Sequence, residues 1–140
     1  MRFIRVISFI GIILASLLLG CQSKQVNELR AHEITSVSIS ESAGFSNFNT
    51  EFFITYEDEN SLAFFEQLFT HAKKEQGVAD MADPEYDMEV LYSNGDRHTY
   101  YLWAGSPGNQ SVLMQLKDTH TIYTTSTEQT LQLLEMLDGN

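Results

Sequence analysis

Hydrophobic and polar residues alternate along several short segments of the chain, a pattern typical of β-strands with one buried face. The six segments with this pattern are 34–40, 51–56, 86–92, 97–104, 111–117 and 120–125. Turn-forming residues separate the last four segments, so we expect one hairpin across Asn94-Gly95 and another across Asp118-Thr119. Because hairpins pair neighbouring strands in opposite directions, the pattern predicts a mostly antiparallel sheet.

Between the second and third expected strands, apolar residues recur at the spacing of an amphipathic helix. Asn60 follows three acidic residues and is the expected N-cap, because acidic side chains favour the positive end of the helix dipole. Lys73 and Lys74 are expected in the last turn, and Gly77 is expected to end the helix. The predicted buried side chains are Leu62, Phe65, Leu68, Phe69 and Ala72.

The chain closes with a second expected helix. Ser126 and Gln129 have the spacing of a capping box. The expected apolar face consists of Leu131, Leu134 and Leu137. The order of elements is then β-β-α-β-β-β-β-α, which predicts an α+β fold. We expect a mostly antiparallel sheet of about five to six strands with two helices packed on one face.

The length of the loop at Gly95 decides which face of the strand at 97–104 is buried. A two-residue loop pairs the apolar row around Met88 with Thr99, Tyr101 and Trp103. A three-residue loop with Gly95 in the left-handed conformation pairs it instead with His98, Tyr100 and Leu102. We favour the longer loop because Leu102 and Ala104 then continue one apolar row.

The N-terminus begins with a short basic segment that contains Arg2 and Arg5. An uncharged run then extends from Val6 to Leu19, and as a helix it would be about 21 Å long, shorter than the ~30 Å hydrocarbon core of a bilayer. This length is typical of the hydrophobic region of a secretory signal peptide. The run ends at Gly20-Cys21, and Cys21 is the only cysteine in the chain.

The segment Leu18-Leu19-Gly20-Cys21 resembles the lipobox of bacterial lipoproteins. In that family the cysteine sulfur is diacylglycerated and a peptidase cleaves before it, here between Gly20 and Cys21. The resemblance implies a signal peptide at 1–20 and a lipid on Cys21. The following segment is polar and without periodicity, so we expect a lipidated tether at 21–32, and then a single extracytoplasmic α+β domain at 33–140. The protein would be anchored to the outer face of the cytoplasmic membrane by its lipid.

Acidic residues outnumber basic residues by 19 to 8, and the formal net charge of −11 becomes −13 without Arg2 and Arg5. A field of this sign repels phosphate backbones, so we expect no nucleic-acid partner. Two interpretations stay open: the charge keeps the domain soluble, or it attracts cationic ligands or metals. Because lipid would occupy the thiol of Cys21, we expect neither a disulfide nor any cofactor beyond the covalent diacylglycerol.

Two groups of residues are candidates for metal chemistry. The acidic residues Asp80, Asp83, Glu85 and Asp87 do not have the spacing of an EF-hand loop, and we expect Asp87 to face solvent. His98 and His120 would meet only if their strands are neighbours. We therefore assign no metal site, although these residues define an alternative function.

Catalytic motifs are absent from the sequence: it contains no nucleophile elbow, phosphate-binding loop or paired carboxylates. We therefore predict that the protein is not an enzyme and assign no catalytic residue. Tyr101 and Trp103 lie beside the loop at 105–110 and form a candidate binding surface. The alternative is that these aromatic side chains only cover a face of the sheet.

Three segments, at 83–96, 100–105 and 118–134, resemble the YhfM-like small lipoproteins of Bacillus and relatives. The resemblance implies a membrane-anchored extracytoplasmic domain in a Gram-positive cell, with Cys21 as the lipidated residue. Our first hypothesis is a binding or accessory module whose partner is an unknown envelope protein or small ligand. The alternative is an envelope metal-dependent sensor or enzyme that uses His98, His120 and the acidic loop Asp80–Asp87.

Overall fold

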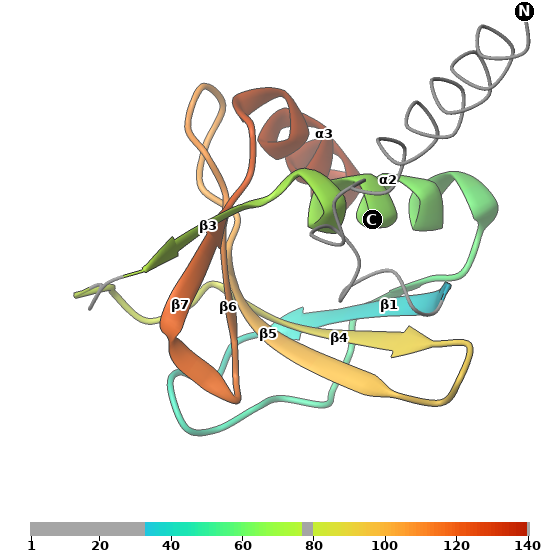
Figure 1. Cartoon of the computed structure of the whole chain (residues 1–140), viewed down its shortest axis with the longest axis horizontal. Coiled ribbons are helices and arrows are strands. Elements are labelled where there is room, and N and C mark those ends of the chain that lie inside the picture. The colour runs from blue at the N-terminus through green and yellow to red at the C-terminus, as the bar shows by residue number, and fades with distance from the viewer. Residues whose placement is uncertain (1–32, 77–79, 140) are drawn as a thin grey trace, which may run out of the picture.

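One antiparallel sheet carries two helices on the same face (Figure 1). The computed structural model describes residues 33–76 and 80–139, which contain seven strands. The strands are β1 (Ile34–Glu41), β2 (Ile54–Tyr56), β3 (Lys73–Gln76), β4 (Tyr86–Tyr92), β5 (Arg97–Trp103), β6 (Val112–Gln115) and β7 (Asp118–Thr124). The helices are α2 (Glu59–His71) and α3 (Thr127–Asp138). The predicted fold class is confirmed, with one strand more than the sequence pattern indicated.

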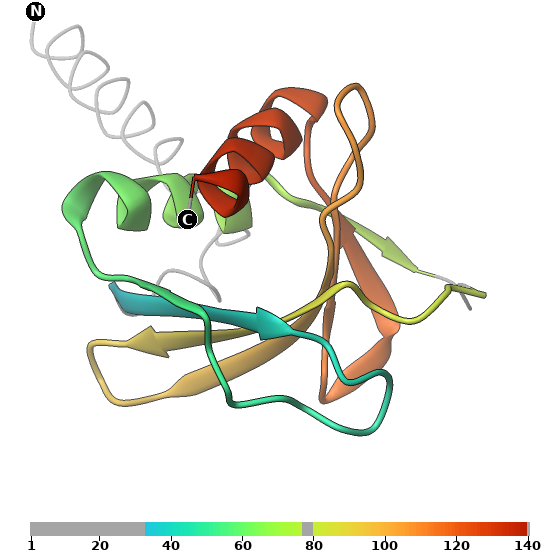
Figure 2. The same cartoon turned by 180° about the vertical axis from the view of Figure 1, so that it is seen from behind.

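The strands follow the order β2-β1-β4-β5-β6-β7-β3 across the sheet. Helix α2 joins β2, at one edge, to β3, at the other, so it must cross the whole sheet. The sheet curls around this helix, and α3 lies beside it on the same side (Figures 1 and 2). We call this the inner face of the sheet and the opposite side the outer face.

The additional strand β3 lies where the sequence predicted the last turn of the first helix. Helix α2 ends at His71, and Lys73 and Lys74 pair with β7 as an edge strand. Lysine is common on edge strands because it discourages further pairing. The N-cap is Asp58, not Asn60, and its carboxylate accepts a hydrogen bond from the Ser61 backbone N–H at 3.0 Å. The expected stop at Gly77 lies outside the described residues.

The hairpin between β4 and β5 has the three-residue loop that we favoured. Gly95 has a φ of 89°, in the left-handed region that glycine adopts readily. Met88 lies opposite Tyr100, and Val90 lies opposite His98. The row of His98, Tyr100 and Leu102 therefore faces inward, which puts Tyr101 and Trp103 on the outer face.

The hairpin between β6 and β7 turns two residues earlier than predicted. Leu116 and Lys117 form the turn, and Gln115 pairs with Asp118 after a shift in register. The predicted turn at Asp118-Thr119 is wrong because both residues belong to β7.

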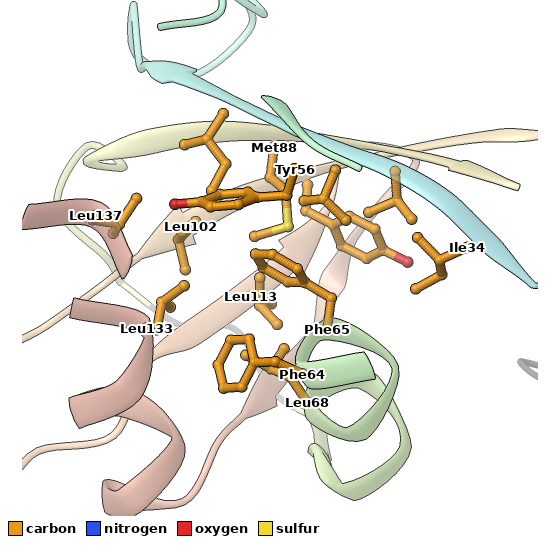
Figure 3. Close-up of a cluster of buried hydrophobic side chains, with 14 of the residues drawn as sticks. Ile34, Tyr56, Phe64, Phe65, Leu68, Met88, Leu102, Leu113, Leu133 and Leu137 are labelled. Atoms are coloured by element: carbon orange, nitrogen blue, oxygen red, sulfur yellow. The ribbon is translucent and has the colours of Figure 1, made fainter. Parts of the chain in front are cut away.

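The hydrophobic core fills the space between the helices and the inner face (Figure 3). Phe65 and Leu68 of α2 are completely buried, as are Met88 and Leu102 of the sheet. Leu133 of α3 closes the core from the other helix. The apolar spacing of both helices thus serves to bury one side of each against the same sheet.

Helix α3 has the predicted capping box, in which Ser126 and Gln129 exchange hydrogen bonds. Its buried face is rotated from the predicted one, because Leu131 is 46% exposed. Thr130 is buried instead, and its hydroxyl contacts those of Ser111 and Thr125 at 3.0 Å. These hydroxyls fix the start of α3 to the ends of β6 and β7.

Candidate functional site

The candidate aromatic surface lies on the outer face, where β5 presents Tyr101 and Trp103. Tyr101 is only 4% exposed, whereas Trp103 is half-buried. The indole N–H of Trp103 donates a hydrogen bond to the Ala82 carbonyl at 2.9 Å. Both rings are thus held in place, and neither is freely exposed to solvent.

The cover over these rings is the loop at residues 42–53, which connects β1 to β2 along the outer face (Figure 2). The backbone N–H of Ser46 donates to the Tyr101 hydroxyl at 3.0 Å. Phe45 stands edge-on to Tyr101, with ring centroids 5.3 Å apart, and its centroid is 5.9 Å from that of Trp103. We call Phe45, Tyr101 and Trp103 the Phe45 patch.

An open depression of about 570 Å³ adjoins this patch. Its lining residues are Phe45, Ser46, Phe48, Tyr101, Met114, Leu116 and Thr119. None of these side chains is charged, although the chain as a whole carries a formal net charge of −11. Phe45 is 40% exposed at the rim, so the patch offers an apolar surface in an acidic domain.

Asp87 holds the loop against the sheet. The prediction that it faces solvent is wrong: Asp87 is completely buried, because the loop covers the outer face of β4. One carboxylate oxygen accepts from the Ser42 hydroxyl at 2.9 Å and the other from the Asn49 backbone N–H at 2.7 Å. The Ser40 hydroxyl adds a bond to the Asn49 carbonyl at 2.6 Å. We call this arrangement the Asp87 clasp.

Sequence reasoning missed both the clasp and Phe45. Once the three-residue loop at Gly95 is chosen, strand alternation puts Asp87 directly opposite Tyr101 on the same face. That register was the available signal for Asp87. Nothing in the local pattern predicts that the loop at 42–53 folds back over this face.

The structure does not bring together His98 and His120, the histidines of the alternative metal site. His98 is on β5 and His120 is on β7, and β6 lies between these strands. The ring of His98 packs against that of Tyr92, with centroids 4.9 Å apart, whereas His120 is exposed. In the described part of the chain, no group of three or more His, Cys, Asp or Glu side chains is placed to hold a metal ion.

The carboxylates of the acidic loop at 80–87 do not gather at one site either. Glu85 accepts hydrogen bonds from the backbone N–H groups of Ala104 and Gly105, at 2.8 and 3.3 Å. Asp87 belongs to the clasp, and Asp80 is exposed. Glu85 and Asp87 therefore support separate loops, and neither shares a site with Asp80.

The predicted lipidation and cleavage residues, Gly20 and Cys21, lie outside the described residues, together with the predicted signal peptide and tether. Among residues 33–76 and 80–139, no helix has the length and hydropathy needed to cross a bilayer.

The fold is similar to that in the crystal structure of a thioesterase-like protein from Clostridium sporogenes ATCC 15579. The TM-score is 0.60 at 17% sequence identity, and the match covers 74% of this chain and 92% of that chain. This finding overturns the prediction that the protein is not an enzyme, since that prediction rested on missing motifs and a thioesterase-like protein has the same fold. At this identity the likeness shows the fold and assigns no catalytic residue.

No match was found among curated proteins. The family model described as YhfM protein matches residues 32–140. This match confirms the resemblance that three sequence segments indicated and spans well over half of the sequence. The chain therefore belongs to the YhfM family.

Proposed function

We propose that the protein is a membrane-anchored bacterial lipoprotein whose domain is a binding or accessory module on the outer face of the cytoplasmic membrane. The lipobox-like segment that ends at Cys21 supports the anchor, since a basic start and a short uncharged run precede it. Two acyl chains on one cysteine satisfy the two-signal requirement for stable anchoring. The acidic domain itself would stay off an anionic membrane surface.

The observation that carries the binding role is the exposure of Phe45 over Tyr101 and Trp103 beside the uncharged depression. Apolar surface of this kind, rimmed by polar residues, is typical of interaction sites. Aromatic side chains on a rigid support contribute strongly to binding, because little conformational entropy is lost. The partner that fits is an envelope protein that inserts an apolar side chain next to Phe45.

The anchor is tested by Cys21→Ser in the full chain. Wild type is expected to incorporate an alkyne-labelled fatty acid and to sediment with membranes. The variant should do neither, because serine has no thiol to accept the lipid. A variant that still takes up the label would contradict lipidation at Cys21.

The binding surface is tested by photo-crosslinking in intact cells. A photoreactive amino acid at Thr119, an exposed residue of the depression, should give a discrete product with a neighbouring protein. Phe45→Ala should abolish this product without lowering the amount of folded protein. Phe53→Ala is the matched control, because Phe53 is 48% exposed but contacts Tyr86 instead of the patch. A product that persists in Phe45→Ala would contradict the proposed surface.

The likeness to a thioesterase-like protein adds a direct assay. The full chain is incubated with acyl-coenzyme A substrates of increasing chain length, and release of free thiol is followed. Thiol release above the buffer rate would make thioester cleavage the activity of this domain. Loss of that activity in Phe45→Ala would then place the acyl group at the Phe45 patch.

A further inference from the structure

A second hollow lies on the inner face, across the sheet from the Phe45 patch. It has a volume of about 100 Å³, is partly open to solvent, and lies between the end of α2 and strands β5, β6 and β7. Phe69 and Leu113 supply apolar wall. His98, Tyr100, Gln115 and Tyr123 add side chains that have both apolar surface and hydrogen-bonding atoms. We call this hollow the inner cavity.

The apolar wall of the inner cavity is rigid. The rings of Phe69 and Tyr100 are in contact, with centroids 5.2 Å apart, and Leu113 is almost completely buried. A packed wall of this kind keeps its shape without a ligand. A closed apolar cavity of about 150 Å³ can hold a benzene ring, so a smaller, partly open cavity suits a ring that protrudes from its mouth.

One of the residues that line the cavity also has a buried polar atom without a partner. Within the described residues, His98 Nδ1 is the one buried side-chain nitrogen or oxygen without a hydrogen-bond partner. A buried polar atom of this kind is destabilising unless water or a ligand supplies the partner. Burial, and then the neighbouring Tyr92 and Tyr123 hydroxyls, raise the pKa of Tyr100, so its hydroxyl stays protonated in its hydrogen bond with Tyr92.

We propose that the inner cavity binds a small uncharged molecule with a flat apolar body and one hydrogen-bonding group. The body would lie against Phe69 and Leu113, and the polar group would lie beside His98 and the tyrosine hydroxyls. The cavity lining contains no Asp, Glu, Lys or Arg, so a charged ligand would be buried without a counter-charge. This site is independent of the Phe45 patch, because the sheet separates the two.

Phenol is the probe that tests the site. The full chain in lipid nanodiscs is titrated with phenol while the methyl NMR signals of Leu113 are followed, and saturable shifts are expected. Ala72→Leu should abolish them, because Ala72 also lines the cavity and a larger side chain would fill it. Ala63→Leu is the matched control: Ala63 is exposed on the same helix, and its variant should bind like wild type. Absence of saturable shifts in wild type, or unchanged binding in Ala72→Leu, would overturn the site.

Substitutions of His98 test the proposed contact with the polar group of the ligand. His98→Leu should weaken phenol binding about threefold to tenfold, the loss of one hydrogen bond. His98→Asn should restore most of the affinity, because its amide puts a polar atom near the position of Nδ1. Unchanged affinity in His98→Leu would overturn the role of His98. Benzoate should bind much more weakly than phenol, and equal binding would overturn the uncharged ligand class.

Discussion

The two faces of the sheet are covered in different ways. On the inner face, α2 and α3 bury a continuous apolar core around Phe65 and Leu133. On the outer face, the loop at 42–53 is held mainly by hydrogen bonds to Asp87 and Tyr101 and by the ring of Phe45. The inner cover thus depends on many weak apolar contacts, and the outer cover on a few directional bonds.

This difference predicts different responses to damage. Apolar packing is shared among many side chains, so losing part of it destabilises the whole domain. Hydrogen bonds that fasten one loop affect that loop first, because local segments can open without global unfolding. The inner face should therefore set the stability of the fold, and the outer face should set the accessibility of the Phe45 patch.

The largest effect is expected from Phe65→Ala on the inner face. Phe65 is completely buried and contacts the rings of Tyr56 and Phe64. Its truncation should lower the free energy of unfolding by about 3–5 kcal/mol, because transfer free energy is lost and a cavity remains. Urea unfolding measures the loss. A cost below about 1 kcal/mol would contradict the view that this core sets stability.

On the outer face, Asp87→Ala removes the acceptor for Ser42 and Asn49. We expect a smaller loss of about 1–3 kcal/mol, the cost of leaving two partly buried donors unpaired. Amide hydrogen exchange should rise mostly within 42–53, while protection in α2 and β4 changes little.

The matched control for the clasp is Glu89→Gln. Glu89 lies on the same strand and face, but its ion pair with Arg97 at 2.9 Å is largely exposed on the arginine side. Exposed pairs contribute about 0–1 kcal/mol, so exchange in the loop should stay as in wild type. If amide exchange in Asp87→Ala became faster throughout the domain, the clasp would support the whole fold. That result would contradict the proposed difference between the inner and outer faces.

The fold was largely predictable because its signals are local and repeated. Alternation indicated six of the seven strands, and Gly95 determined the register of the central hairpin. Strand β3 was missed because Lys73 and Lys74 match the polar end of a helix as well as they match an edge strand. The inward face of α3 was misplaced because Leu131 is apolar but exposed, while Thr130 is buried through hydrogen bonds.

The site was less predictable because it depends on contacts between distant residues. The sequence pattern made Tyr101 and Trp103 candidates for a binding surface, but Phe45, more than fifty positions earlier, packs against both rings. Asp87 was misjudged for the same reason: a carboxylate on a strand is normally exposed, and only the fold reveals the donors of Ser42 and Asn49. Long-range partners of this kind leave no periodic signal in one sequence.

Alkaline pH should have a moderate effect on stability through Tyr100, which is buried on the inner face. Burial raises the pKa of Tyr100, so the unfolded chain loses this proton at lower pH than the folded chain. Stability is therefore full below about pH 10 and falls as pH rises above it, by at most ~1.4 kcal/mol per pH unit for one tyrosine. In Tyr100→Phe, the free energy of unfolding should fall less between pH 7 and pH 11 than it does in wild type. Equal slopes in denaturation series from pH 9 to 11 would contradict the burial argument.

The smallest effect is expected from Leu131→Ala on α3. Leu131 is a leucine in a helix that covers the core, yet it is 46% exposed. Truncation should change the free energy of unfolding by less than about 0.5 kcal/mol, as for most surface substitutions. Leu133→Ala is the matched control: this leucine is completely buried, and the same substitution should cost about 2–5 kcal/mol. Similar costs for the two leucines would mean that α3 is rotated from the observed orientation, and that the inner cover is not held by the face that contains Leu133.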